Sequence, residues 1–535
     1  ALVQEAVSVN RELIRASMTW EEICCHSIES AAKFLFGEGK RNPPGLVHAL
    51  EDMCRSFESP ETVGEHEFVA KYGASLLSAR DQGRRCIENG STDKDLASLW
   101  RKWHGIHKLC TSNIKEGALH TDLSEISPRL ASFRNMNYSV PGTAIRQTGK
   151  HVQILEFNKV IEILASKQRP RKLTIRGSDG KTYRFLLKPR EDLRMDERCM
   201  QLFTLVNSLL SSDQEALHRN AHKFTNIAAN AGLLSWFERG DTLQAIVRQY
   251  RRLQGLTMDL ELKLQTQCAP GIAKGTLSSL QQVELFELAL EATKGEDIAS
   301  ILWRKSTSTA AWMERRTAFS RSMATNSMIG HILGLGDRHP SNALQDRLTG
   351  EIVLIDFGDC WEMAQERESF PEKMPFRLTR QLITAMGPTG VEGHFRLCSQ
   401  RFMELMRNNK ESVEAVFSAF VHDPLVQHLV LHPRQLPESE PPNTVCEGDE
   451  TAQIGTPQAR FPMRRRKTER SSGKPITQLS PRAQLAIARV KQKLEGKEFG
   501  NGEPVSVEEQ VSLLIQQATD IWALSSAFQG WCAFF

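Results

Sequence analysis

The residues most able to do chemistry lie in two short segments past the middle of the chain. The segment Gly334–Asn342 reads GLGDRHPSN and holds Asp337, His339 and Asn342. An apolar run follows and ends at Asp356, the first residue of an Asp-Phe-Gly triplet. Two carboxylates, an amide and an imidazole are the groups needed to hold a divalent metal and ATP phosphates beside a hydroxyl acceptor. The pattern therefore predicts phosphoryl transfer.

Each of these residues has an expected role in that reaction. Asp356 and Asn342 present hard oxygen atoms, which Mg²⁺ or Mn²⁺ prefers as ligands. Asp337 is the candidate base, because it precedes Asn342 by five residues, as in protein-kinase catalytic loops. His339 is the candidate donor to a γ-phosphate oxygen or a participant in proton transfer. The order Asp-Arg-His differs from the His-Arg-Asp of ordinary protein kinases. The alternative is a turn with a solvated Asp and a structural His.

A kinase also needs a cation on the phosphates, and the candidate is Lys188, at the end of an expected strand. Glu191 and Asp196 follow closely and are expected to pair with this lysine and fix its side chain. The alternative is a solvated charge run, since residues 188–198 include eight charged side chains.

The loop expected to cover the phosphates contains no glycine. It reads ASKQRPRK over residues 165–172, so hydroxyl, amide and backbone N–H groups must replace a glycine-rich loop. The basic residues could instead form a nucleic-acid patch, but no aromatic residues alternate with them, as stacking on bases requires.

The elements that must position these residues change along the chain. Residues 11–112 favour a four-helix bundle with short connections. Residues 151–190 alternate as strands, and a helix follows over 193–210. From about 240 to 430 the pattern is mostly helical, apart from the loop and strand of the two motifs. We therefore expect an α+β protein. The four helices of the bundle are expected over 11–37, 45–57, 65–89 and 96–110.

Residues 436–481 differ in composition from the rest of the chain. They contain seven prolines and few large apolar side chains, which predicts a disordered regulatory insert. Order is expected to resume with a helix at about 482–495, and the chain ends in a cluster of aromatic residues.

Composition limits the class of protein. A chain of 535 residues is expected to form three or four domains. The formal net charge of +4 is too small for a dedicated nucleic-acid-binding protein. Eleven cysteines without metal-binding spacing predict reduced thiols. No apolar stretch reaches 18 residues and no signal-peptide pattern opens the chain. Because the chain starts at Ala1 in helix-like sequence, we expect a fragment of a longer protein.

Together these features resemble the phosphatidylinositol 3-kinase-related protein kinases, and within that family the target-of-rapamycin (TOR) kinases. The resemblance covers nearly all of the chain and is carried by SKQRPRKL, EDLRMDERCMQLF, GLGDRHPSN, DFGDCW and FPEKMPFRLTR. Residues 11–110 resemble the FRB domain, a rapamycin-binding four-helix bundle, and the terminal GWCAFF resembles the FATC segment. The fold implied is a bilobal phosphoinositide-kinase-like kinase domain, preceded by the FRB bundle and followed by a helical FATC segment.

The resemblance also implies a division of the chain into segments. These are the end of a preceding helical (FAT) region at 1–10, the FRB bundle at 11–112, the kinase N-lobe with its linker at 113–240, the C-lobe at 241–435, the insert at 436–481, a C-lobe helix at 482–502 and FATC at 503–535.

By position in the family's motifs, the resemblance implies an ATP site formed by both lobes. Lys188 would contact phosphate with Glu191 and Asp196 in support, and Trp236 and Phe237 would line the hinge. The other residues expected to bind ATP are Ser166, Gln168, Leu186, Thr242, Leu344 and Ile355. The stretch 221–231 is shorter than the family's hinge-proximal strand.

The FRB resemblance implies a ligand surface that departs from the family pattern. His104 and His107 stand where TOR kinases usually have aromatic residues, and Leu35 stands where they have tyrosine. Imidazoles remove apolar contact area and add polar groups that need partners, so we expect binding of the immunophilin–rapamycin complex to be weakened or lost. The two histidines could instead bind a metal, but no third ligand is in view. The expected surface comprises Ile28, Ala32, Leu35, Phe36, Trp100, His104 and His107.

The segment after Asp356 bears on the class of substrate. Between Asp359 and Pro375 it has five acidic and two basic residues, whereas a phosphoinositide kinase should present cations to its head group. Serine or threonine in proteins is therefore the expected acceptor. A lipid kinase is the alternative enzyme, and a catalytically inactive scaffold is the alternative from another class. Scaffolds of this kind typically lose one of the motif residues, and all are present here.

The resemblance further implies partners and a location. Protein substrates, larger TOR-complex scaffolds and a small WD40 β-propeller subunit bound near 251–290 are expected, with no nucleic acid. The FATC aromatic residues either make peripheral contact with a membrane or pack against the kinase lobe. We expect a cytoplasmic protein of growth signalling, with endomembrane association as an open alternative.

Overall fold

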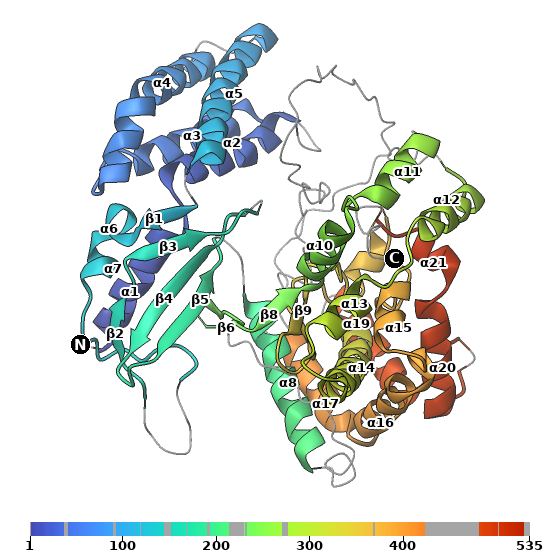
Figure 1. The fold of residues 1–535 in the computed structure, drawn as a ribbon. Coiled ribbons are helices and arrows are strands. Elements are labelled where there is room, and N and C mark those ends of the chain that lie inside the picture. The colour runs from blue at the N-terminus through green and yellow to red at the C-terminus, as the bar shows by residue number, and fades with distance from the viewer. Residues whose placement is uncertain are drawn as a thin grey trace. The chain divides into compact units, whose positions relative to one another are not determined.

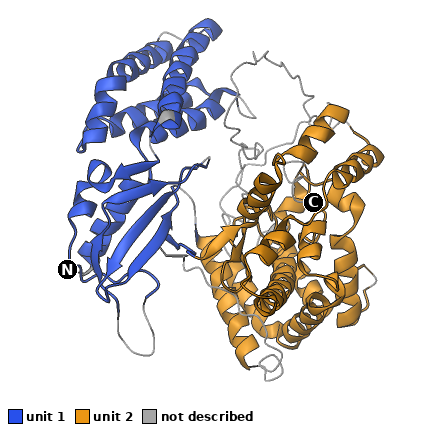
Figure 2. Ribbon diagram, in the orientation of Figure 1, with its two compact units in different colours: residues 1–193, 227–238 blue, residues 194–226, 239–535 orange. Residues whose placement is uncertain are grey.

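The computed structural model of the chain divides into two compact units (Figure 2). Unit 1 comprises residues 1–193 and 227–238, and unit 2 comprises residues 194–226 and 239–535. The insert expected at 436–481 lies outside the described residues, except for its last position. The described residues are 2–36, 41–88, 92–117, 119–143, 151–166, 168–189, 193–212, 229–230, 233–269, 277–367, 370–422, 481–500 and 502–528.

Unit 1 contains a four-helix bundle (Figure 1). A buried apolar core that includes Leu46, Phe68 and Trp103 holds it together. The last helix starts at a capping box, in which the Thr92 hydroxyl accepts the backbone N–H of Asp95. The helices of the bundle are α2 (Trp20–Phe36), α3 (Pro43–Ser56), α4 (Val63–Glu88) and α5 (Asp93–Glu116).

The prediction of a single helix over residues 11–37 is wrong, because the chain forms two helices there. Helix α1 (Leu2–Ser17) ends before Thr19, whose backbone N–H donates to the Glu22 carboxylate at 2.9 Å. The Glu22 N–H donates to the Thr19 hydroxyl at 3.4 Å, so this pair forms a second capping box that starts α2. The apolar face of α1 is buried with the core of the sheet through Val9, Leu13 and Ala16.

The described strands of unit 1 form a seven-stranded antiparallel sheet in the order β1–β3–β4–β5–β7–β6, with β2 paired to β4. The longest strands, β4 and β5, form a hairpin that ends just before Lys188. The elements of this region are β1 (His120–Asp122), α6 (Leu123–Ile126), α7 (Pro128–Ser132), β2 (Ile154–Phe157), β3 (Val160–Ile163), β4 (Arg171–Gly177), β5 (Thr182–Leu187), β6 (Ala229–Asn230) and β7 (Leu233–Ser235).

Unit 2 is mostly helical (Figure 1). Helix α8 (Arg194–Ser212), expected in the N-lobe, groups with this unit. No helix within the described ranges is long and apolar enough to cross a membrane. The other helices are α10 (Leu243–Gln254), α11 (Leu260–Cys268), α12 (Ser279–Glu291), α13 (Asp297–Arg304), α14 (Thr309–Leu333), η2 (Met363–Glu366), α15 (Arg380–Ala385), η3 (Gly390–Glu392), α16 (His394–Asn408), α17 (Lys410–His422), α19 (Pro481–Glu495), α20 (Val507–Ala518) and α21 (Ile521–Ser525).

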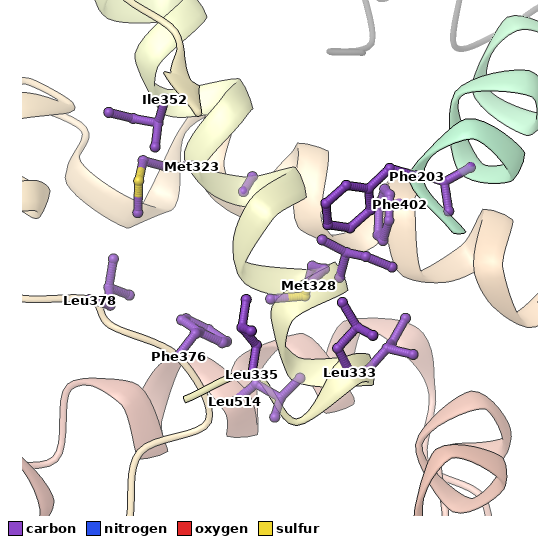
Figure 3. Close-up of a cluster of buried hydrophobic side chains, with 14 of the residues drawn as sticks. Phe203, Met323, Met328, Leu333, Leu335, Ile352, Phe376, Leu378, Phe402 and Leu514 are labelled. Carbon is purple, nitrogen blue, oxygen red and sulfur yellow. The ribbon is translucent and has the colours of Figure 1, made fainter. Parts of the chain in front are cut away.

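Helix α14 passes through the core of unit 2 and is buried on every side over its last turns. Figure 3 shows Met323 and Met328 of this helix among apolar side chains such as Phe203 and Phe402. Leu333, the last residue of α14, and Leu335 are both buried in the same cluster. The loop that carries Asp337 therefore starts from a fixed point in the core.

A three-stranded antiparallel sheet in unit 2 supports the two motifs. Its strands are β8 (Gly240–Thr242), β9 (Ala343–Asp346) and β10 (Ile352–Leu354), in the order β10–β9–β8. Strand β9 starts directly after Asn342, and β10 ends two residues before Asp356. The sheet thus brings the catalytic-loop segment and the Asp-Phe-Gly segment side by side.

Candidate active site

The catalytic loop leaves the core at a position that requires glycine. Gly334 caps α14 with a φ of 59°, and a Cβ there would lie 2.6 Å from the backbone nitrogen of Glu362. Asp337 itself has a φ of 55°, a left-handed conformation that few residues other than glycine adopt. Its backbone N–H donates to both carboxylate oxygens of Glu372, at 3.0 and 3.1 Å. The activation segment therefore holds Asp337 in place.

Asn342 connects the catalytic loop to the Asp-Phe-Gly segment. Its side-chain nitrogen donates to the backbone oxygen of Asp337 at 3.0 Å. Its backbone oxygen accepts the N–H of Ile355, the residue before Asp356, also at 3.0 Å. Because the amide nitrogen is the donor, the side-chain oxygen of Asn342 is the atom suited to a metal. The structure therefore brings together Asp337, Asn342 and Asp356.

Arg338 is a buried residue of this loop to which the sequence motifs assigned no role. Its guanidinium donates to the backbone oxygens of Gly336 at 2.7 Å and Ile355 at 3.0 Å, and to that of Asp356. One side chain thus fixes the backbone of both segments. The same group lies 5.9 Å from the centre of the Phe357 ring. The only sequence signal for this role is the position of Arg338 inside the motif.

Asp196 holds the Asp-Phe-Gly segment from helix α8. Its Oδ1 atom accepts the backbone N–H of Phe357 at 3.1 Å, and the residue is buried. The Phe357 ring packs edge-on against Phe203, also on α8, with centroids 5.2 Å apart. Asp196 was expected to support Lys188, and the contact with Phe357 is a role that sequence reasoning missed.

His339 is arranged to donate a proton. The backbone N–H of Ser341 donates to His339 Nδ1 at 3.1 Å, so the neutral ring carries its hydrogen on Nε2. Burial lowers the pKa of His339, against the effect of the nearby Asp337 carboxylate. The Nε2 atom lies 4.0 Å from Asp337 Oδ2. The two expected catalytic groups therefore lie side by side.

Acidic groups of the activation segment gather around Arg367. Its guanidinium pairs with Asp359 and, at 3.1 Å, with Glu372. Burial raises the pKa of Glu372 to about 7 and also raises the pKa of Asp359, in both cases against the effect of Arg367. Burial lowers the pKa of nearby Arg377 to about 9. These shifts indicate a site with little water around its charges.

The expected ATP-binding residues of unit 2 lie on its small sheet. Thr242 of β8 pairs with Leu344 of β9, and Ile355 follows β10. The Thr242 hydroxyl also accepts the backbone N–H of Ala245 at 3.0 Å, which caps helix α10. The three residues therefore lie on, or directly after, the paired strands of this small sheet.

The expected ATP-binding residues of unit 1 lie on its larger sheet. Leu186 of β5 pairs with Lys172 on one side and with Leu234 on the other, and Lys188 follows the end of β5. The backbone N–H of Trp236 donates to Arg184 at 2.8 Å, so the chain continues along β5 towards Phe237. The Lys172 ammonium lies 4.9 Å from the centre of the Trp236 ring.

The loop between β3 and β4 carries Ser166 and Gln168. The Ser166 backbone oxygen accepts the N–H of Arg169 at 3.1 Å, which makes the loop a tight turn. Glu191 lies outside the described residues, as does almost all of the stretch 221–231.

The described residues are better suited to a magnesium site completed by phosphate and water than to a metal site whose ligands all come from the protein. It has no group of three or more His, Cys, Asp or Glu side chains that could hold a metal ion. Asn342 and Asp356 supply two hard oxygen ligands, and Mg²⁺ commonly combines one or two protein ligands with phosphate oxygens and water. Among the residues that the structure describes, no third ligand accompanies His104 and His107.

The expected FRB ligand surface is only partly exposed. Phe36, Trp100, His104 and His107 form a row of rings with successive centroid distances of 5.3, 6.5 and 6.2 Å. Phe36 is 66% exposed. Ala32 is partly buried. Ile28 and Leu35 face the bundle core and are only 1% and 9% exposed, so they do not belong to the accessible surface.

Three family models match the chain. The phosphatidylinositol 3- and 4-kinase model matches residues 182–430. The FKBP12-rapamycin binding domain model matches residues 12–111, and the FATC domain model matches residues 504–535. The expected kinase, FRB and FATC parts of an α+β chain are therefore confirmed.

Named relatives align with the whole chain. It is 37% identical to serine/threonine-protein kinase tor1 of Schizosaccharomyces pombe, 38% to serine/threonine-protein kinase mTor of Drosophila melanogaster and 37% to serine/threonine-protein kinase TOR2 of Saccharomyces cerevisiae. Each alignment covers 100% of this chain but 23%, 22% and 21% of the relative, respectively. The chain thus spans less than a quarter of the length of these relatives.

Solved structures of CtTel1 share the fold. The FAT and kinase domain of CtTel1 aligns with a TM-score of 0.57 and 20% identity over 96% of this chain and 38% of that one. The complete C2-symmetric CtTel1 dimer gives 0.56 and 21% over 96% of this chain and 17% of that one. At this identity the likeness concerns the fold alone.

Proposed function

Since the chain belongs to the TOR group of the phosphatidylinositol 3-kinase-related protein kinases, we propose that it transfers the γ-phosphate of ATP to serine or threonine side chains of proteins in growth signalling. The observation that carries this proposal is the position of Asn342. It binds the backbone of Asp337 through its side chain and that of Ile355 through its own backbone, which gathers the three motif residues.

Asp337 and His339 act on the reacting groups in this proposal. The Asp337 carboxylate orients the acceptor hydroxyl and takes up its proton as the hydroxyl oxygen bonds to the γ-phosphorus and the bond from that phosphorus to the ADP oxygen breaks. The neutral His339 ring donates from Nε2 to a phosphate oxygen, where negative charge must be stabilised. Lys188 contributes a further cation to the phosphates.

Asn342 and Asp356 would hold Mg²⁺ or Mn²⁺ through their side-chain oxygens. When bound, the metal neutralises phosphate charge and orients the γ-phosphate for in-line attack. Arg338 supports Asp356, because its guanidinium binds the backbone oxygens of Ile355 and Asp356. The adenine would rest on Leu344 and Ile355, with Thr242, Leu186, Trp236 and Phe237 around it and Ser166 and Gln168 near the phosphates.

The acidic activation segment favours proteins over phosphoinositides as acceptors. Its one described arginine, Arg367, is already paired with Asp359 and Glu372 and is poorly placed to bind an anionic head group. A lipid kinase is therefore the weaker candidate.

The test is phosphate transfer from labelled ATP by the whole chain, with a mixture of proteins and with phosphatidylinositol vesicles as acceptors. We expect label in protein serine and threonine, and at least about a hundredfold loss in Asp337→Asn. Glu503→Gln, an exposed carboxylate outside the site, is the matched control. Label in lipid alone would favour the lipid kinase. No transfer, with normal folding, would favour an inactive scaffold.

Partners and location form a separate part of the proposal. Helix α12 exposes Leu280 and Leu288, 57% and 39% accessible, which supports docking of a WD40 β-propeller subunit on the segment 251–290. Larger scaffolds of TOR complexes would bind elsewhere on the whole protein. We place the protein in the cytoplasm. Within FATC, Phe528 packs against Phe370 with ring centroids 5.4 Å apart, so peripheral membrane contact is left to the last aromatic residues, which lie outside the described ranges. Co-purification with a β-propeller protein, lost on Leu280→Asp with Leu288→Asp, tests the docking.

A further inference from the structure

Glu22, in the first turn of the FRB bundle, is bound to the loop that is expected to cover the ATP phosphates. Its carboxylate accepts from Arg169 Nε at 2.9 Å and from the guanidinium of Arg171. Arg169 is the penultimate residue of the β3–β4 loop, and Arg171 is the first residue of β4. A single carboxylate therefore joins the bundle to the sheet, whose buried apolar cores are separate clusters within unit 1.

This ion pair is shielded from water. Arg171 is 0% exposed, and the side chains of Glu22 and Arg169 are 10% and 18% exposed. In such surroundings the removal of one partner leaves a charge uncompensated, so the position of the loop depends strongly on the carboxylate. Surface ion pairs, which are worth little, do not have this property.

The backbone of the loop is held in a tight turn at the same point. Arg169 has a φ of 45°, its N–H donates to Ser166, and the Leu164 N–H donates to Pro170 at 3.0 Å. The Arg171 guanidinium also donates to the backbone oxygen of Arg169. Glu22 thus acts on a turn that contains no glycine. The backbone of this turn therefore has little freedom to change the positions of its hydroxyl, amide and N–H groups.

We propose that Glu22 is a positioning residue for the phosphate loop, so that nucleotide affinity depends on the attachment of the FRB bundle. This inference rests on the nucleotide site of the proposed function, because it takes Ser166 and Gln168 to approach the phosphates. A ligand or partner that displaces the start of α2 would then weaken ATP binding without touching the nucleotide. Because coupling between two binding sites is reciprocal, bound ATP would in turn weaken the binding of that ligand or partner.

The variant Glu22→Gln tests the proposal in the whole chain. Glutamine keeps the capping box with Thr19, because either Glu or Gln can serve there, but it removes the charge that binds the two arginines. We expect the KM for ATP to rise about fivefold to tenfold while kcat and the KM for protein substrate change less than about twofold. The matched control is Glu21→Gln, the adjacent carboxylate, whose charge acts on Tyr72 and Cys110 inside the bundle.

Direct binding of ADP with Mg²⁺, measured by calorimetry, separates this inference from the proposed function. If the wild-type chain transfers no phosphate but Glu22→Gln still weakens ADP binding, the kinase proposal fails and the inference stands. If ADP affinity and the KM for ATP both stay within about twofold of wild type in a folded Glu22→Gln protein, the pair is only a tether and the inference is overturned.

A milder variant covers the case in which Glu22→Gln does not fold. Glu22→Asp keeps the charge on a shorter side chain, and it should raise the KM for ATP by a smaller factor with an unchanged melting temperature. Arg169→Gln completes a double-mutant cycle, in which the combined variant should be no worse than the more severe single one. Additive effects of Glu22→Gln and Arg169→Gln would contradict the proposal.

Discussion

The backbone N–H of Asp337 donates to both carboxylate oxygens of Glu372, at 3.0 and 3.1 Å. This contact holds the candidate catalytic base in a left-handed backbone conformation, which costs a non-glycine residue about 1 kcal/mol. Asn342 binds the other side of the same residue, through the Asp337 carbonyl oxygen. The geometry of the candidate site therefore depends on the activation segment as well as on the loop that carries Asp337.

The first prediction concerns the loss of this carboxylate. In Glu372→Gln one oxygen is replaced by an NH₂ group, which cannot accept the Asp337 N–H, and the ion pair with Arg367 is lost. Losing a charge-assisted hydrogen bond costs about 1.5 kcal/mol, so kcat should fall about tenfold with the KM for ATP nearly unchanged. Steady-state kinetics measures both. Glu366→Gln, in the same segment but half exposed, should leave kcat as in the wild type. An unchanged kcat in Glu372→Gln would show that Asp337 is held without Glu372.

The second prediction concerns pH. Burial raises the pKa of Glu372 from its ordinary 4.5 to about 7. Between these values the folded state holds a proton that the unfolded state has released, so the free energy of unfolding falls as the pH rises from about 4.5 to about 7. The upper bound for this group is about 3 kcal/mol. Activity should change in the opposite direction, because only the carboxylate accepts from Asp337 with both oxygens.

Urea unfolding of the wild type and of Glu372→Gln at pH 5.5, 6.5 and 7.5 tests this prediction, because the difference between their free energies of unfolding isolates the titration of Glu372. The wild-type protein should lose stability relative to Glu372→Gln across this range, because the glutamine does not titrate. Equal pH dependence in the two proteins would show that Glu372 does not titrate in this range. The kcat of the wild type should rise through about pH 7, whereas that of Glu372→Gln should not.

Local patterns in the sequence could predict what a single segment supplies. The apolar run before Asp356 predicts a strand, and β10 spans Ile352–Leu354. The box at Thr92 predicts the helix start that the structure has. Thr19-Trp-Glu-Glu22 fits the same box and would have placed the break between α1 and α2, but helical periodicity over 11–37 concealed it.

Contacts between distant segments could not be predicted in this way. Glu372 lies 35 residues after Asp337, and Asp196 lies 161 residues before Phe357. Their side chains meet because burial leaves backbone N–H groups that need acceptors, and only the tertiary packing decides which carboxylate is near. The burial of Ile28 and Leu35 has the same origin, since the packing of α2 selects which helix face is accessible.

The third prediction concerns a buried ion network that supports the segment 251–290. The Arg251 guanidinium binds Glu261 at 2.6 Å and Asp297 at 2.9 Å, and all three residues are nearly inaccessible. Glu261→Gln leaves the Arg251 charge only partly compensated, so the free energy of unfolding of unit 2 should fall by about 3 kcal/mol. Denaturant unfolding measures the change. Glu287→Gln, exposed on α12, should change stability by less than about 0.5 kcal/mol. A similarly small effect of Glu261→Gln would mean that the network contributes little.

The fourth prediction concerns the row of rings on the FRB bundle. His107 Nε2 lies 2.9 Å from Glu29, and this bond raises the pKa of His107, so a charged imidazole stands on the expected drug surface near pH 6.5. A charge on this surface opposes burial of an apolar ligand. Binding of the immunophilin–rapamycin complex should therefore be weak, and weaker still as the pH falls.

Replacement of the two imidazoles tests this interpretation. His104→Tyr with His107→Phe restores apolar contact area and should strengthen ternary binding about tenfold or more, with no remaining pH dependence between pH 6 and 8. The matched control is His66→Phe, on helix α4. Surface plasmon resonance with immobilised immunophilin gives the affinities. Tight binding by the wild-type chain, insensitive to pH, would mean that Phe36 and Trp100 suffice to hold the drug and that the histidines do not obstruct it.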